Sequence, residues 1–220
     1  MAWVGIIVVA KALKLEKYGF ELKAYSLVYK NKSVNDVLIK VLGRTKRGIK
    51  VFADLSVIAG FLMMGFAFYF LLNNVSNYFV APDGFSELTV LIPGVTLTSA
   101  PAITYFLLSI PIVLVMHEGA HGIVAALEKI KIKTGGFAIF IALFAGFVEP
   151  DEEEFEKAKK ISKLRVIGAG ATSNVLFAIV LGAIMLTNPI FGMVLESIPL
   201  FGDVILNTFY ELSQGVLILS

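Results

Sequence analysis

The chain has 220 residues, of which 57% are hydrophobic and 16% are charged, and its formal net charge is +2 at neutral pH. Soluble globular chains average about 45–50% apolar and about 25% charged residues, so this composition argues against a soluble domain and predicts an integral membrane protein. The sequence contains no cysteine, which excludes a disulfide framework and a thiolate metal site.

Apolar residues occur in continuous runs rather than in the alternating ten-residue segments of transmembrane β-barrels. We therefore predict an all-α polytopic membrane protein with about three to five transmembrane helices.

All 19 Lys and Arg residues fall into two windows, eleven between Lys11 and Lys50 and eight between Lys129 and Arg165. Because cytoplasmic loops of membrane proteins carry the excess of basic residues, we expect 11–50 and 129–165 to be cytosolic loops of a multi-pass protein of the cell membrane. Both windows also contain acidic residues, so we expect no nucleic-acid partner. The sequence predicts no particular oligomeric state.

The first predicted region is 1–50, a short apolar segment followed by the basic region. Residues Met1–Ala10 are too few to span a bilayer with confidence.

The membrane-embedded core is predicted at 51–186. Its first span is Val51–Leu72, a run of about 20 residues that is long enough to cross about 30 Å of hydrocarbon. Residues 73–100 contain Asn, Asp and Glu but no Lys or Arg and are predicted to form an outer loop.

The second span, Ile103–Leu127, carries the only two histidines of the chain, His117 and His121, in the pattern His-Glu-x-x-His. Residues four apart lie on one face of a helix, so both imidazoles can bind one zinc ion. At 1.5 Å per residue they lie about 18 Å and about 12 Å along the helix from Lys129, in the cytosolic half of the membrane. Polar groups at that depth are costly, which favours a functional role.

The pattern predicts a hydrolytic zinc site with one Zn²⁺. Zinc lowers the pKa of bound water toward about 7, and Glu118 is the expected general base that accepts the proton and later passes one to the leaving amide nitrogen. A catalytic zinc needs three protein ligands, and this pair supplies two.

Residues Thr134–Val148 are apolar and glycine-rich, and both flanks carry cytosolic-type charge. They are too short for a helical crossing and return to the same side, so we predict a membrane-inserted β-hairpin next to the zinc helix. Strand edges cannot face lipid, so such a hairpin is a candidate to bind an extended peptide. A buried structural loop is the alternative. The acidic run at Asp151–Glu154 predicts a helix start.

A third span is predicted at Val166–Leu186 and contains Asn174, a candidate for substrate contact or for a hydrogen bond between helices. Residues 187–220 are predicted to be extracytoplasmic or interfacial, and 190–210 to be an interfacial or re-entrant segment because Pro, Gly and acidic residues interrupt it.

Several segments together resemble the site-2 protease family of intramembrane zinc metalloproteases, in particular its archaeal and bacterial members. The segments are Ile110–Gly122, Gly146–Glu154, Arg165–Asn174 and, more weakly, Leu91–Val95. The resemblance implies an endopeptidase that cleaves transmembrane segments of membrane-anchored regulatory proteins. It also implies substrate contacts by Gly146, Phe147 and Asn174.

The sequence departs from the family in two places. No proline precedes Asn174 where the family has Gly-Pro, and no Asp-Gly follows the histidines, although the family takes its third zinc ligand from such a motif. We therefore expect a chain truncated before that ligand, which would then lie beyond Ser220, and a chain without that ligand can lack activity. Residues 187–220 would then lead into the PDZ domain that many members carry.

Two other functions fit the histidine pair. A prenyl-protein-type membrane protease would need a downstream glutamate ligand, such as Glu149 or one of Glu152–Glu154. A divalent-metal transporter or sensor would need further ligands on several spans, but the other two spans offer only Asp54 and Asn174.

Overall fold

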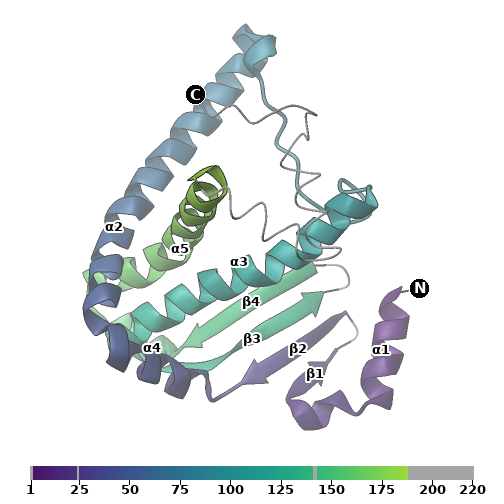
Figure 1. Ribbon diagram of the computed structural model, residues 1–220, viewed down its shortest axis with the longest axis vertical. Helices are drawn as coiled ribbons and strands as arrows, with labels where there is room; N and C mark the ends of the chain where they lie inside the picture. Colours follow the sequence, from purple (N-terminus) through teal and green to yellow (C-terminus); the bar gives the residue numbers. More distant parts are fainter. Residues whose placement is uncertain (1, 24, 141–142, 188–220) are drawn as a thin grey trace. The chain divides into compact units, whose positions relative to one another are not determined.

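The computed structural model describes residues 2–23, 25–140 and 143–187 (Figure 1). The chain divides into two compact units, Met1–Asn174 and Val175–Ser220, and the packing described here is that of the first. The predicted boundaries at 50 and 186 stay predictions, and the segment 190–210 lies outside the described residues.

The helices are α1 (Ala2–Ala12), α2 (Val34–Val80), α3 (Ala100–Leu127), α4 (Glu152–Lys157) and α5 (Lys160–Thr187). The strands are β1 (Phe20–Leu22), β2 (Ser26–Asn31), β3 (Ile132–Phe140) and β4 (Leu143–Pro150).

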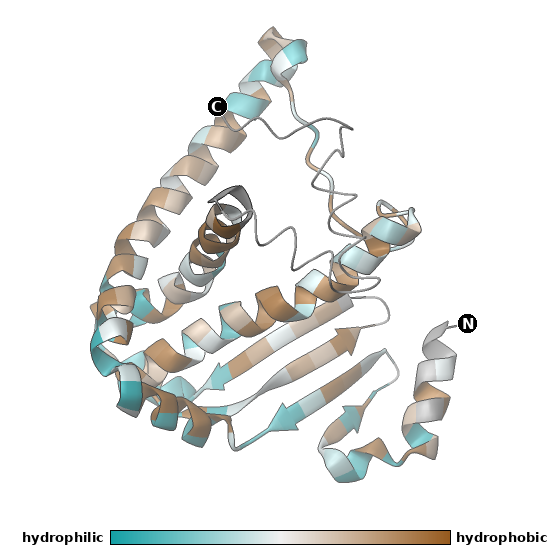
Figure 2. Cartoon of the chain, viewed as in Figure 1, coloured by the Kyte–Doolittle hydropathy of each residue, from teal (hydrophilic) through white to brown (hydrophobic). Residues whose placement is uncertain are grey.

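Three of the described helices are long and apolar enough to cross a membrane: α2, α3 and the part of α5 from Lys160 to Ile184. They contain the first two predicted spans and all but the last two residues of the third. Of the about three to five membrane helices predicted, the described residues therefore supply three that are long and apolar enough. In Figure 2 the first turns of α2 alternate between hydrophilic and hydrophobic residues, whereas its middle is mainly hydrophobic, which follows the charge pattern of the sequence. Helix α1 has only 11 residues.

Helix α2 ends later than the sequence predicts. It continues to Val80, so the prediction of an outer loop from residue 73 was wrong over its first residues. Two of the asparagines there hold the backbone of the following segment. Asn74 donates to the carbonyl of Ser86 and accepts from its N–H, both at 2.8 Å, and Asn77 donates to the carbonyl of Gly84 at 2.9 Å.

A four-stranded antiparallel sheet corrects the all-α prediction. Its strand order is β1-β2-β3-β4, and β3 and β4 form the predicted hairpin over Thr134–Val148 with slightly wider bounds. Strands β1 and β2 come from the basic region and were not predicted. They join because Phe20, Tyr29 and Phe137 pack their rings together, with centroids 4.9–6.1 Å apart. A Cβ at Gly136 would overlap the backbone of Tyr29, so glycine is needed where β2 meets β3.

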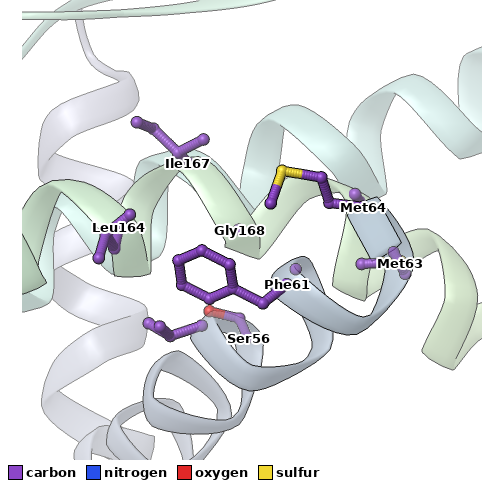
Figure 3. Close-up of a pocket in the computed structure, with 10 residues that line it drawn as sticks. Ser56, Phe61, Met63, Met64, Leu164, Ile167 and Gly168 are labelled. Carbon is purple, nitrogen blue, oxygen red and sulfur yellow. The ribbon is translucent and has the colours of Figure 1, made fainter. Parts of the chain in front are cut away.

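Helices α2 and α5 approach closely through small residues. A Cβ on Gly168 would lie 2.5 Å from the carbonyl oxygen of Ser56, whose hydroxyl donates to the carbonyl of Arg165 at 3.2 Å. Small side chains allow this kind of packing between membrane helices. Beside the crossing lies an apolar pocket of about 410 Å³ formed by α2 and α5, with Phe61, Met64 and Ile167 in its lining (Figure 3).

Strand β4 leads directly into α4, whose start was predicted from the acidic run. Asp151 caps this helix by accepting from the N–H of Glu154 at 3.0 Å, which confirms the prediction. The same hydrogen bond lowers the pKa of Asp151, so its carboxylate stays ionised to a lower pH than that of an ordinary aspartate.

An ionic cluster connects α2 and α5 with the end of α3. Arg165 donates to Glu128 at 2.9 Å and also to Asp54, and Ser162 donates to the same Glu128. The side chains of Arg165 and Glu128 are largely buried. Asp54, which the sequence shows only as a lone charge near the start of a span, therefore has a partner.

Replacing Arg165 with methionine is expected to destabilise the protein by about 1.5–3 kcal/mol, because two carboxylates lose a charged hydrogen-bond donor. Thermal unfolding in detergent measures the loss. Lys157→Met is the matched control, because its pair with Glu153 is exposed and such pairs contribute about 0–1 kcal/mol. Equal unfolding temperatures for the two variants would show that the cluster contributes no more to stability than an exposed ion pair does.

Candidate active site

The two histidines lie one turn apart on α3, as the helical period predicts, and both contact α5. Their Nε2 atoms are 3.1 Å apart, and the ring planes meet at 77°. On the opposite side of each ring, Nδ1 of His121 lies 2.6 Å from the carbonyl oxygen of Val166, and Nδ1 of His117 lies 3.1 Å from the amide of Asn174. The two Nε2 atoms therefore point toward each other, and each Nδ1 atom contacts a residue of α5.

The contact with Val166 fixes the tautomer of His121. A carbonyl oxygen only accepts hydrogen bonds, so Nδ1 of His121 carries the proton and its Nε2 presents a lone pair. That lone pair is directed toward Nε2 of His117.

The space at the two Nε2 atoms is kept open by Gly170 on α5. A Cβ at this position would overlap Nε2 of His121 and lie 2.6 Å from Nε2 of His117. The next turn of α5 is fixed to α3 by Ser173, whose hydroxyl contacts the carbonyl of Met116 at 3.0 Å and that of Gly170 at 2.7 Å. The roles of Val166, Gly170 and Ser173 were not predicted from the sequence. Glycines in an apolar span, such as Gly168 and Gly170, were the available signal for a close approach.

Glu118 contacts the hairpin. Its carboxylate accepts a hydrogen bond from the N–H of Val148 on β4 at 3.1 Å. A Cβ at Gly146 would lie 3.0 Å from Cγ of Glu118 and 3.3 Å from Cβ of Leu114, so glycine lets β4 approach α3 at this level. Figure 1 shows β4 running beside α3.

A groove of about 530 Å³ lies between α3 and the sheet. Glu118, Gly146 and Phe147 line it together with Tyr29 of β2 and Leu114 of α3, and most of the lining is apolar. The structure thus brings Glu118, Gly146 and Phe147 to one groove, while it places Asn174 on His117. Neither histidine lines this groove, nor do they line the pocket between α2 and α5.

Within 2–23, 25–140 and 143–187, no group of three or more His, Cys, Asp or Glu side chains is placed to hold a metal. Two of the four glutamates that a prenyl-protein-type protease could use have other partners: Glu149 accepts from Thr134 at 2.8 Å and Glu154 from the N–H of Lys131 at 2.7 Å. Asp203 lies outside the described residues.

The model of peptidase family M50 matches residues 105–218, which is more than half of the chain. The matched region contains both histidines, Glu118, the β3–β4 hairpin and Asn174. No solved structure matches the chain.

Proposed function

The chain belongs to peptidase family M50, the site-2 protease family, and we propose that it is an intramembrane zinc metalloprotease that cleaves transmembrane segments of membrane-anchored regulatory proteins. Family membership and three helices long enough to span a bilayer indicate a membrane protein of a metallopeptidase family. The observation that carries the proposal further is the convergence of two imidazole Nε2 atoms, 3.1 Å apart, on a helix where Glu118 follows His117 in the sequence.

The residues present fit one zinc ion. Two nitrogens at about 2.0–2.1 Å from a tetrahedral zinc are roughly 3.3 Å apart, close to the observed separation of the Nε2 atoms. Histidines that ligate a metal usually engage their other ring nitrogen, as both do here. Gly170 leaves room where a side chain would collide with both rings. We propose His117 and His121 as two ligands, with the third supplied from outside the described residues.

Zinc, when bound, would act as a Lewis acid and would lower the pKa of a bound water molecule to about 7. Glu118 follows His117 on α3 and is the proposed general base, taking a proton from water and returning one to the leaving amide nitrogen. Val166 and Asn174 orient the two imidazoles. Because Val148 donates to Glu118, the base is also held by the hairpin.

The groove between α3 and the sheet is the proposed site for the substrate. Its apolar lining suits a transmembrane segment, and β4 is the last strand of the sheet, so an extended peptide can add to its free edge. Gly146 and Phe147 are then the proposed substrate contacts, and contact of Asn174 with substrate stays a prediction. A peptide at this edge would compete with Glu118 for the N–H of Val148.

The basic regions 11–50 and 129–165 support a multi-pass arrangement in the cell membrane with both regions in the cytosol. The end of α3 at Leu127 leads into the second basic region, so the histidines are proposed to be reached from the cytosolic side of the bilayer.

Removing metal with a chelator is expected to reduce cleavage of a membrane-anchored test substrate to background, and adding zinc is expected to restore it. Reloading with Mg²⁺ is the matched control, because magnesium prefers oxygen ligands to imidazole. Undiminished cleavage by metal-free protein would overturn the proposed function.

A further inference from the structure

A directional chain of hydrogen bonds crosses the histidine pair. The N–H at Nδ1 of His121 donates to Val166, which leaves Nε2 of His121 as an acceptor. Nε2 of His117 lies 3.1 Å from that acceptor, so without metal it is Nε2 of His117 that carries a proton. Nδ1 of His117 is then an acceptor, and it faces the NH₂ group of Asn174 at 3.1 Å.

A bound metal requires the opposite arrangement at His117. Its Nε2 must present a lone pair to the metal, so the proton of the neutral ring moves to Nδ1. The NH₂ group of Asn174 cannot accept that proton in a hydrogen bond, whereas the Oδ1 atom of the same amide can. In the structure this Oδ1 is buried and has no hydrogen-bond partner.

We propose that Asn174 is a positioning residue whose side-chain amide turns over when metal binds, donating to Nδ1 of His117 before and accepting from it after. This rests on the proposed zinc function. A half-turn of the amide exchanges its nitrogen and oxygen, so either orientation leaves one polar atom unpartnered and the amide can serve both states. Asparagine supplies a donor and an acceptor at one place, which leucine and aspartate do not.

The two states can be read directly because the chain has only two histidines. In ¹⁵N-histidine NMR spectra of the full chain in detergent without metal, we expect the proton on Nε2 of His117 and on Nδ1 of His121. On adding zinc, we expect both protons on Nδ1. In the metal-free Asn174→Asp protein, Nδ1 of His117 should already carry a proton, because a carboxylate only accepts.

Zinc affinity, measured by competition with a chelator, gives the second readout. Asn174→Leu is expected to lower affinity about 10- to 100-fold, the usual effect of losing such a partner, whereas Asn174→Asp should bind zinc at least as tightly as wild type. Asn74→Leu is the matched control: it removes a buried asparagine elsewhere, which holds the loop at Ser86, and should leave zinc affinity unchanged.

A proton on Nδ1 of His117 in the metal-free wild type would overturn the proposal, as would wild-type zinc affinity in Asn174→Leu. The metal-free spectra need no zinc and no substrate. A protein that shows the expected tautomers but neither binds zinc nor cleaves a substrate would therefore refute the proposed protease while leaving the hydrogen-bond chain intact.

Discussion

Replacing Glu118 with glutamine is expected to abolish cleavage while zinc binding is retained. A general base contributes about 10²- to 10⁴-fold to the rate, and glutamine cannot accept the proton from water. Its amide oxygen can still accept from the N–H of Val148, so the contact between α3 and β4 persists. Initial cleavage rates and zinc content, measured on the same preparation, separate these two effects.

Glu153→Gln, an exposed glutamate on α4, is the matched control and should cleave at the wild-type rate. Wild-type cleavage by Glu118→Gln with zinc bound would refute its role as the base. Loss of zinc from the same variant would instead identify Glu118 as a metal ligand.

Gly170→Ala is expected to weaken the binding of zinc, which is the second large effect. The added Cβ would overlap Nε2 of His121 and lie 2.6 Å from Nε2 of His117, so the rings must separate or α5 must shift. Overpacking of this kind costs about 1–3 kcal/mol. At 1.4 kcal/mol per tenfold change, that corresponds to a roughly 5- to 150-fold weaker affinity for zinc if the cost falls on the metal-bound state.

Gly182→Ala on the same helix is the control, since a Cβ there meets no atom within 4 Å. It should leave zinc affinity and cleavage unchanged. If Gly170→Ala binds zinc as tightly as Gly182→Ala, the space beside Gly170 is not the metal site.

Local sequence patterns were sufficient to predict the features that depend on neighbouring residues. The spacing of His117 and His121 predicts one helical face, and the cap at Asp151 follows from an acidic run. The hairpin could be predicted because its apolar segment has cytosolic-type charge at both ends. Each of these predictions uses residues that lie close together in the chain, and each is confirmed.

Features that depend on distant residues were not predicted. Strand β2 is a short segment in a basic region, and it joins the hairpin through its pairing with β3, more than a hundred residues later in the chain. The contact of Asn174 with His117 requires α5 to approach α3 at Gly170, which depends on the packing of two helices. Sequence alone left Asn174 open between substrate contact and a helix–helix hydrogen bond.

The central claim is that His117 and His121 hold the zinc ion on which cleavage depends. Anomalous scattering at the zinc absorption edge, recorded from crystals of cleavage-competent protein, tests it most directly. We expect one zinc peak at about 2.0–2.1 Å from Nε2 of both histidines. Cleavage-competent protein with no zinc peak between these two atoms would contradict it.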